Sequence, residues 1–343
     1  MSNVGRTLAA LLLVLHGACV GAVAGSHAHG ASEGKRVASR SAKPGACAPA
    51  AAQEFPAPYA AIVVDVNSGR ILHADKAEEL RHPASLTKMM TLFLLFEALE
   101  AGTVRLDSEL LVSEHASMQE RTNLNLGPGQ TINVQDAILG LVVHSANDAA
   151  VVVAEALGGT ETAFAERMML KARALGMDHT VYRNASGLPD DAQVTTARDQ
   201  AVLGCALQER FPGYYPYFST QSFLWRGKKL RNHNKLLGRV KGMDGIKTGY
   251  IRSSKFNLVA SVRRNDRHIV AVILGGSSAN ARDARMVALI DQSLASATPR
   301  RSVLIASANR DDGRAGRRAS GHKSSALSGG SVTTGGAFAS TER

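Results

Sequence analysis

The pattern that most constrains the fold is a set of strand-like segments at the two ends of a long helical stretch. Residues 59–66 form an apolar, β-branched run, and a turn at 67–69 followed by residues 70–74 completes a hairpin. Four more strands are expected after the helical part, at 222–226, 245–248, 256–263 and 268–274. Strands at both ends of a helical middle predict an α/β (α+β) fold, in which an antiparallel sheet is backed by helices and a mostly helical second lobe is inserted.

The helical middle begins after Pro83, a residue that cannot continue a helix from the segment before it. A long apolar helix is expected from Ser85 to about Glu100, because Pro commonly stands next to a helix start. Apolar periodicity predicts further helices at 134–143, 148–156, 161–175, 196–209 and 281–294.

The ends of the chain differ in composition from this central part. Arg6, an apolar run and Ala22-Val23-Ala24 predict a cleaved signal peptide over residues 1–24, which would export the chain to the periplasm or cell envelope. An uncleaved membrane anchor and lipidation at Cys19 are the alternatives. Residues 25–54 are expected to be a disordered linker, and residues 299–343 a disordered basic tail rich in Ser, Gly and Arg. The folded domain is therefore expected at 55–298.

The net charge of +11 suggests a nucleic-acid partner until its distribution is considered. The segments outside residues 55–298 carry +8 of it, so only +3 remains for the folded domain. A nucleic-acid groove on that domain is therefore not expected. The basic tail is instead a candidate for weak electrostatic contact with a membrane or wall polymer, with a passive solvated tail as the alternative.

Cysteine and histidine give no sign of a metal or a cofactor. After signal cleavage only Cys47 and Cys205 remain, too few for a zinc framework. A disulfide between them stays open, although Cys47 lies in the linker and Cys205 in an apolar helix. The eleven histidines show no paired helical spacing. We expect neither a metal site nor a bound cofactor.

Ser85 and Lys88 form the first motif that could carry chemistry. Three residues apart at a helix start, they lie on one face, so the amine can reach the hydroxyl. Serine is a poor nucleophile until a base takes its proton. Lysine can be that base if burial and a second cation, for which Lys247 is the candidate, lower its pKa. The alternative is a helix-capping serine beside a solvated lysine.

Ser145 and Asn147 lie between two predicted apolar helices. A hydroxyl there could relay a proton to a leaving amine, and an amide could hold a substrate carbonyl or Lys88. The alternative is an ordinary turn with a capping serine.

Lys247, Thr248 and Gly249 end a predicted strand. A cation next to a hydroxyl suits a carboxylate, and a glycine without a side chain lets a peptide lie along the strand edge. The alternative is a surface strand that ends in a turn glycine. Ser-x-x-Lys and Ser-Ala-Asn each occur elsewhere in this chain, so the order and context of the three motifs make the prediction.

Together these segments closely resemble the exported serine D-alanyl-D-alanine carboxypeptidases, the low-molecular-mass penicillin-binding proteins. The similarity covers residues of about 55–296. It is carried by the sequences at 82–91 (HPASLTKMMT), 145–149 (SANDA), 184–188 (NASGL), 196–199 (TARD), 244–250 (DGIKTGY) and 256–261 (FNLVAS). The resemblance implies the fold that serine β-lactamases share with penicillin-binding proteins.

It also implies an activity, the removal of the terminal D-Ala from peptidoglycan stem peptides that end in D-Ala-D-Ala, with β-lactam antibiotics as covalent inhibitors. Ser85 would form the acyl-enzyme, with Lys88 as general base and Ser145 as proton shuttle. The substrate would be bound by Asn147, Lys247, Thr248 and Gly249. The backbone N–H groups of Ser85 and Tyr250 would form the oxyanion hole.

Two features depart from the family pattern. Lys255 stands where many relatives have glycine, and only about 45 low-complexity residues follow the domain, where some relatives have a β-rich domain and an anchoring helix. Three other functions share the motifs and stay open. They are a D,D-endopeptidase acting on cross-linked peptidoglycan, a serine β-lactamase, and a non-catalytic penicillin-sensing or peptidoglycan-binding module. A lactamase would ordinarily carry Ser-Asp-Asn as its middle motif.

Overall fold

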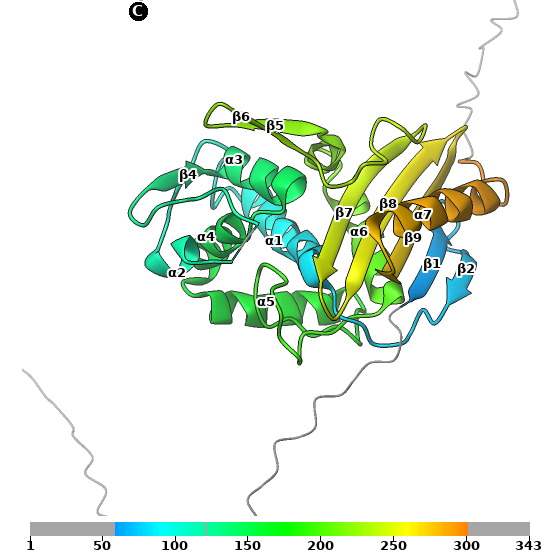
Figure 1. Ribbon diagram of the computed structural model, residues 1–343, viewed down its shortest axis with the longest axis horizontal. Coiled ribbons are helices and arrows are strands. Elements are labelled where there is room, and N and C mark those ends of the chain that lie inside the picture. The colour runs from blue at the N-terminus through cyan, green and yellow to red at the C-terminus, as the bar shows by residue number, and fades with distance from the viewer. Residues whose placement is uncertain (1–58, 121, 301–343) are drawn as a thin grey trace, which may run out of the picture. The chain divides into compact units, whose positions relative to one another are not determined.

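The computed structural model describes residues 59–120 and 122–300 (Figure 1). The predicted signal peptide, the predicted linker and all but the first two residues of the predicted tail lie outside the described residues. The helices are α1 (Lys88–Glu100), α2 (Glu114–Ser117), α3 (Val134–Leu139), α4 (Asn147–Gly158), α5 (Glu161–Ala174), α6 (Ala197–Arg210) and α7 (Ala279–Leu294). The strands are β1 (Ala60–Asp65), β2 (Ile71–Asp75), β3 (Glu109–Leu111), β4 (Thr131–Asn133), β5 (Ser222–Trp225), β6 (Lys228–Arg231), β7 (Met243–Ile251), β8 (Lys255–Arg264) and β9 (Arg267–Gly276).

The main sheet has five strands in the order β2-β1-β9-β8-β7, and every neighbouring pair is antiparallel. The first and last parts of the described chain meet in the middle of this sheet, where β1 pairs with β9. Asn265 and Asp266, both with positive φ, join β8 to β9 in a two-residue hairpin turn. The predicted antiparallel sheet is confirmed.

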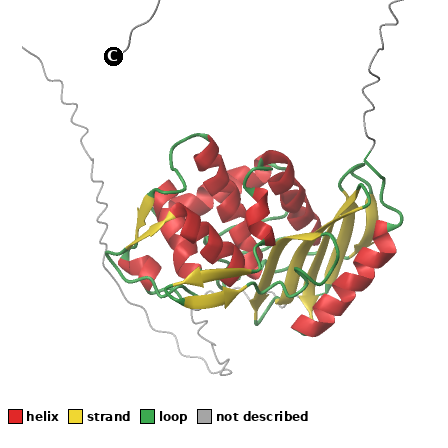
Figure 2. Ribbon diagram, turned by 90° about the horizontal axis from the view of Figure 1, so that it is seen from above, coloured by secondary structure: helices red, strands yellow, loops and turns green. Residues whose placement is uncertain are grey.

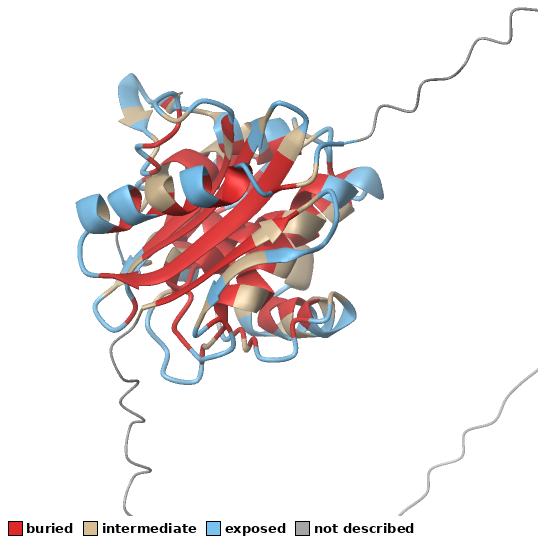
Figure 3. Cartoon of the chain, turned by 90° about the vertical axis from the view of Figure 1, so that its right-hand side faces the viewer, coloured by how far each residue is buried: buried red, intermediate tan, exposed pale blue. Residues whose placement is uncertain are grey.

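Side chains on the two faces of the sheet enter two separate cores. Ala61 and Val63 of β1 point to the face covered by α7, where they pack with Leu289 and Ile290. Ile62 joins the core on the opposite face, which contains α1, α6 and the helical lobe. Figures 2 and 3 show α7 alone on one side and the buried central strands between the two layers. The period-2 alternation of the strands therefore builds a three-layer domain.

Helix α1 lies at the centre of the helical lobe. Every residue from Lys88 to Phe96 is buried, so this helix is apolar on all sides, as expected of a helix surrounded by protein. A single turn of 3₁₀ helix, Ala84–Thr87, precedes it. The sequence-based prediction of one helix from Ser85 is therefore corrected, because Ser85 lies in the 3₁₀ turn and the α-helix begins at Lys88.

Three more details differ from the sequence-based predictions. The segment at 222–226 forms a separate hairpin with β6 and is not part of the main sheet. The helix predicted at 134–143 changes after α3 into a π-helical turn, Gly140–His144. The strand predicted at 245–248 extends over Met243–Ile251. Among the described residues, no helix combines the length and apolar character needed to cross a bilayer.

Candidate active site

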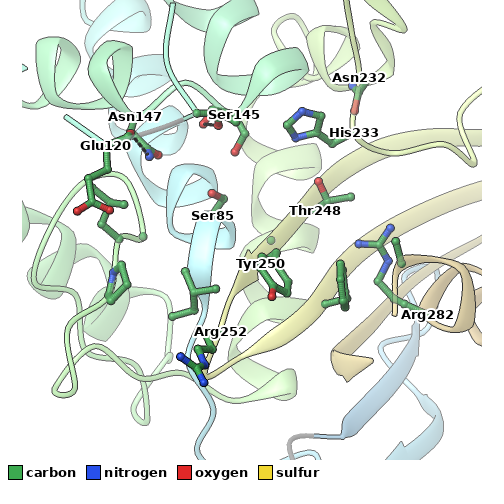
Figure 4. Close-up of a pocket in the computed structure, with 18 of the residues that line it drawn as sticks. Ser85, Glu120, Ser145, Asn147, Asn232, His233, Thr248, Tyr250, Arg252 and Arg282 are labelled. Carbon is green, nitrogen blue, oxygen red and sulfur yellow. Dashed lines mark hydrogen bonds between the residues drawn. The ribbon is translucent and has the colours of Figure 1, made fainter. Parts of the chain in front are cut away.

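A cleft of about 660 Å³ lies between the edge strand β7 and the helical lobe (Figure 4). Its walls include six of the residues singled out in the sequence: Ser85, Ser145, Asn147, Thr248, Gly249 and Tyr250. Lys88 and Lys247 are buried next to it, with exposed fractions of 0% and 2%. Segments as distant as 85 and 248 in the sequence therefore meet at one place.

Strand β8 holds the turn that carries Ser85 through the side chain of Asn257. The side-chain amide of Asn257 donates hydrogen bonds to the carbonyl oxygens of His82 and Pro83, each at 3.1 Å. Its own oxygen accepts a hydrogen bond from Gly275 N at 2.9 Å. Asn257 is fully buried, so removing its side chain would remove three buried hydrogen bonds to backbone groups.

Two glycines pack against the same turn, and a β-carbon would collide with the turn at Gly187 and crowd it at Gly249. A β-carbon on Gly187, whose φ is +85°, would lie 1.9 Å from the carbonyl oxygen of Ala84. A β-carbon on Gly249 would lie 3.2 Å from the backbone nitrogen of Ser85. Gly249 therefore brings the backbone of β7 directly beside Ser85, which explains why this position in the motif lacks a side chain.

Lys88 lies one turn below Ser85 and contacts three oxygens. Its Nζ is 3.2 Å from Ser85 Oγ, 2.6 Å from Asn147 Oδ1 and 2.5 Å from the carbonyl oxygen of Ser186. The amide and carbonyl oxygens can only accept hydrogen bonds, so they use two N–H groups of the amine. In a neutral amine the remaining valence is a lone pair, which then faces the Ser85 hydroxyl. The geometry thus fits a neutral lysine that accepts the proton of Ser85.

The surroundings of Lys88 favour this neutral form. Burial, and secondly the positive charge of Lys247, hold the pKa of Lys88 well below its usual value. Asp148 and Glu161 act in the opposite direction, because their negative charges favour the ammonium form. The balance lowers the pKa, as a general base working near neutral pH requires.

The segment with Ser145 and Asn147 has an unusual backbone that fixes both side chains. Ser145 adopts a left-handed conformation (φ +62°, ψ +36°), which costs a residue with a β-carbon roughly 1 kcal/mol. The Nδ2 group of Asn147 donates to the carbonyl oxygen of Glu120 at 2.8 Å. This contact turns the amide so that its oxygen faces Lys88.

Asp148 secures the segment that orients Asn147. Its buried carboxylate accepts hydrogen bonds from the backbone N–H groups of Leu124 and Leu126, at 2.9 and 3.1 Å. These contacts fix the backbone at Leu124 and Leu126. The backbone N–H of Asn147 also donates to the carbonyl oxygen of Thr122, at 2.7 Å. Asn147 is therefore held at both its backbone and its side chain.

Lys247 connects the strand to the helical lobe. Its Nζ donates to Ser145 Oγ at 2.9 Å and to the carbonyl oxygen of Thr248 at 3.0 Å. Burial, together with the positive charge of Arg282, lowers the pKa of Lys247 to about 7. An anionic group placed between Lys247 and Arg282 would favour the charged form of Lys247, so this end of the cleft suits a carboxylate.

Four residues that shape the site could not be singled out from the sequence: Arg282, Glu161, Asn257 and Ser186. Arg282, on α7, lines the cleft and donates to the carbonyl oxygen of Asn257 at 3.1 Å. Glu161 accepts a hydrogen bond from Ala185 N at 2.9 Å and pairs with His115, so it braces the loop that supplies the Ser186 carbonyl. The motif sequences around Asn257 and Ser186 were the only signals available. Nothing in the local sequence indicates the contact of Arg282.

Among the described residues, the site offers neither a free Glu161 carboxylate nor a cluster of metal ligands. Glu161 is fully engaged by Ala185 and His115, which disfavours a role as a water-activating carboxylate. Within residues 59–120 and 122–300, no three His, Cys, Asp or Glu side chains gather closely enough to hold a metal ion. Ser85 Oγ contacts the amine of Lys88, and the backbone of Gly249 lies beside Ser85, an arrangement suited to acyl transfer by a serine.

Comparisons with curated proteins return D-alanyl-D-alanine carboxypeptidases. The chain is 31% identical over 239 residues to DacF of Bacillus subtilis, covering 67% of this chain and 60% of that protein. It is 32% identical over 236 residues to DacA of Escherichia coli, covering 67% of this chain and 59% of that protein. The chain thus spans about three fifths of the length of these curated relatives.

Solved structures of penicillin-binding proteins have a similar fold. Penicillin-binding protein 6B of Escherichia coli matches with a TM-score of 0.65 and 31% identity, covering 68% of this chain and 76% of that one. Penicillin-binding protein D2 of Listeria monocytogenes, in its ampicillin-bound form, matches with a TM-score of 0.60 and 30% identity, covering 68% and 96%. The family model described as D-alanyl-D-alanine carboxypeptidase matches residues 48–278. The chain therefore belongs to the D-alanyl-D-alanine carboxypeptidase family of serine peptidases.

Proposed function

We propose that this protein removes the terminal D-Ala from peptidoglycan stem peptides that end in D-Ala-D-Ala, through an acyl-enzyme on Ser85. The observation that carries the proposal is the contact between Lys88 Nζ and Ser85 Oγ, at 3.2 Å, in a site where burial lowers the pKa of the amine. Family membership and the names of the relatives support the substrate class.

Acylation begins when Ser85 Oγ attacks the carbonyl carbon of the penultimate D-Ala and its proton passes to Lys88. The oxyanion receives hydrogen bonds from the backbone N–H groups of Ser85 and Tyr250. In other hydrolases one such donor contributes about 3–4 kcal/mol. The C–N bond then breaks, and Ser145 gives a proton to the leaving amine and receives in return the proton that Lys88 took.

Deacylation reverses these proton movements with water as the nucleophile. Water attacks the ester carbonyl and gives its proton to Lys88, and the Ser85 oxygen leaves and regains a proton from that same amine. The products are free D-Ala and a peptide shortened by one residue. Lys88 returns to its neutral form, so the cycle leaves the protonation of the enzyme unchanged.

The terminal carboxylate of the substrate is the group that distinguishes a carboxypeptidase substrate. We assign it to Lys247 and Thr248, with Asn147 binding the acyl-side amide and Gly249 leaving space for the peptide along β7. Arg282 adds a second cation at this end of the cleft. The same groups would hold the carboxylate of a β-lactam, a proposal supported by the ampicillin-bound relative.

The test is release of D-Ala from a soluble peptide ending in D-Ala-D-Ala, together with intact-mass analysis after penicillin treatment. One adduct and D-Ala release are expected in the wild type, and Ser85→Ala should lose both. Ser253→Ala, in an exposed turn, is the matched control and should retain both. An adduct that survives Ser85→Ala would refute the assignment of the nucleophile.

The same measurements separate the alternatives. Rapid hydrolysis of the antibiotic would indicate a β-lactamase, and labelling without D-Ala release would indicate a sensing module. Cleavage of a cross-linked muropeptide dimer in preference to the monomer would indicate an endopeptidase.

Because peptidoglycan lies outside the inner membrane, we propose that the protein acts in the periplasm or cell envelope. Residues 1–24 are the proposed export signal. We also propose that residues 299–343, with a net charge of +5, contact anionic lipid or wall polymer weakly. A truncation after Arg300 keeps Ala297 and Thr298, whose backbone groups bond to Arg267 and Asp65 of the domain. It should then keep peptide turnover and sediment less with anionic vesicles at low salt. Equal sedimentation would reject this contact.

A further inference from the structure

The edge of the main sheet opposite the active-site cleft contains a second hollow. Strand β2 forms this edge, whereas the cleft lies at β7, and the hollow shares no lining residue with the cleft. It has a volume of about 480 Å³ and lies where β1 and β2 face α5 and α6. Its lining includes six apolar side chains: Ile62, Val64, Ile71, Leu175, Val202 and Cys205.

The described part of the chain leaves this apolar lining incompletely covered. Ile71 is 43% exposed, and Val64, Val202 and Cys205 are only half-buried. Removing apolar surface from water is favourable, and a hollow of this size and lining is typical of a binding site. An apolar segment that covered these side chains would therefore be bound there.

The described chain ends beside this hollow. After α7, the backbone N–H of Thr298 donates to Asp65 Oδ2 at 2.9 Å, and its carbonyl oxygen accepts a hydrogen bond from Asn67 Nδ2 at 2.8 Å. Gly69, two residues after Asn67, lines the hollow. Arg300, the last described residue, follows Thr298 by two positions. The chain beyond Arg300 therefore starts at the β1–β2 turn, next to the hollow.

The last turn of α6 lies at the same end of the sheet. Gln208 Oε1 accepts a hydrogen bond from Arg263 at 2.8 Å, and Arg263 pairs with His268. The carbonyl oxygen of His268 accepts a hydrogen bond from Val66 N, directly after β1, at 2.9 Å. Glu209, the residue after Gln208, is exposed and lines the hollow. It forms no ion pair or hydrogen bond among the residues that the structure describes, so its carboxylate is available to a cation.

The sequence after Arg300 matches this arrangement in both charge and apolar character. Arg301 comes first, and the aliphatic sequence at 303–305 (VLI) follows. It is the only place in residues 301–343 where large aliphatic side chains are consecutive. In an extended chain, at about 3.3 Å per residue, these three residues lie about 10–17 Å from Arg300. They are therefore close enough to enter a hollow that begins at Glu209.

We infer that residues 303–305 of this chain's own tail occupy the hollow at the β2 edge, with Arg301 paired to Glu209. The three aliphatic side chains would cover Ile71 and Cys205. This contact would fix the start of the basic tail at one edge of the sheet, and the rest of the tail would continue from there. The inference does not depend on the proposed carboxypeptidase function, because the hollow and the cleft lie at opposite edges of the sheet.

Cys205 allows the occupancy of the hollow to be measured. The chain has three cysteines, so Cys19→Ser and Cys47→Ser leave Cys205 as the only thiol of the full chain. Burial raises the pKa of this thiol to about 11, so its alkylation by iodoacetamide is compared at one fixed pH. The full chain should be alkylated about tenfold more slowly than a truncation after Arg300, because the thiol would react only in the minor fraction of molecules with an open hollow.

Two single substitutions in the tail show whether the aliphatic sequence is responsible. Leu304→Ser should lose most of the protection of Cys205, because it places a hydroxyl in the apolar hollow. Leu327→Ser removes an isolated leucine of the same tail and should keep the protection. Equal alkylation of the full chain and the truncation would overturn the inference. Equal alkylation of the two serine variants would overturn it as well.

A disulfide experiment identifies the occupant. In the same background, Leu304→Cys should form a disulfide with Cys205 under mild oxidation, since such a bond requires Cα atoms within about 7 Å of each other. Leu327→Cys should form it about tenfold more slowly, because only a docked segment has a high effective concentration at the hollow. Mixed ¹⁵N-labelled and unlabelled chains show whether the link lies within one chain, as expected. A link between two chains would assign the hollow to a second copy and overturn the inference.

Discussion

Gly187 and Ala84 are in such close contact that a β-carbon at residue 187 would lie 1.9 Å from the carbonyl oxygen of residue 84. Ala84 directly precedes the proposed nucleophile. We therefore expect Gly187→Ala to displace the Ser85 turn. A displacement of about 1 Å in an active site can cost about 100-fold in rate, and we expect acylation by a fluorescent penicillin to slow to about that extent.

The matched control for this change is Gly159→Ala, at the end of α4. Gly159 also has a positive φ, +78°, but a β-carbon there would meet no atom within 4 Å. In both variants the positive φ should cost about 1 kcal/mol of stability because alanine disfavours it, and Gly187→Ala should lose more because its β-carbon overlaps the Ala84 carbonyl. Only Gly187→Ala should lose acylation. Similar acylation rates in the two variants would contradict the packing argument.

The two buried lysines predict a bell-shaped pH dependence of kcat/KM for a peptide acid. Activity should rise with pH as Lys88 loses its proton, because only the neutral amine accepts the proton of Ser85. It should fall again as Lys247, with a pKa of about 7 in the free protein, loses the charge that binds the carboxylate.

A peptide that ends in a carboxamide distinguishes the rise of kcat/KM with pH from its fall. It lacks the negative charge that Lys247 binds, so its profile should keep the rise and lose the fall. In Lys247→Ala, the preference for the acid over the amide should also disappear. An unchanged preference in that variant, or the same alkaline fall for both peptides, would exclude Lys247 from carboxylate recognition.

Lys247 should also make stability depend on pH. Its pKa is about 7 in the folded protein and near 10.5 when the chain is unfolded. Between these values the unfolded chain binds more protons, so the free energy of unfolding rises with pH by up to about 1.4 kcal/mol per unit. From pH 7 to 9 the wild type should gain about 2 kcal/mol relative to Lys247→Met. Urea unfolding at both pH values measures this, and equal changes in the two proteins would contradict it.

Much of the site could be predicted because its chemistry lies in short local patterns. The three-residue spacing of Ser85 and Lys88 correctly predicted that the amine reaches the hydroxyl, although the two residues lie at the junction of a 3₁₀ turn and α1. The prediction that Asn147 could hold Lys88 agrees with their contact at 2.6 Å. The prediction that Lys247 is the second cation agrees with its lowering of the pKa of Lys88.

The remaining contacts depend on the tertiary structure. The carbonyl oxygen of Ser186 binds Lys88, but a backbone group carries no side-chain signature in the sequence. Arg282 reaches the cleft from a helix that packs on the other face of the sheet. In the fold, β6 was not predicted because its sequence, KKLR, is mostly charged and is paired only through its hairpin with β5. Each case requires a long-range partner that one sequence does not reveal.

Asn257 provides the last prediction, because its single side chain connects β8 and β9 to the turn that carries Ser85. Asn257→Ala would remove its hydrogen bonds to the carbonyl oxygens of His82 and Pro83 and to the N–H of Gly275, and the loss of a buried hydrogen-bond partner costs about 1–3 kcal/mol. We expect the unfolding free energy to fall by about 3 kcal/mol or more, and acylation to slow in the fraction that stays folded. Asn67→Ala, which removes another side-chain amide that donates to two backbone carbonyls but does not line the cleft, is the control. If acylation per folded molecule were the same in Asn257→Ala as in the wild type, Asn257 would stabilise the sheet without positioning Ser85.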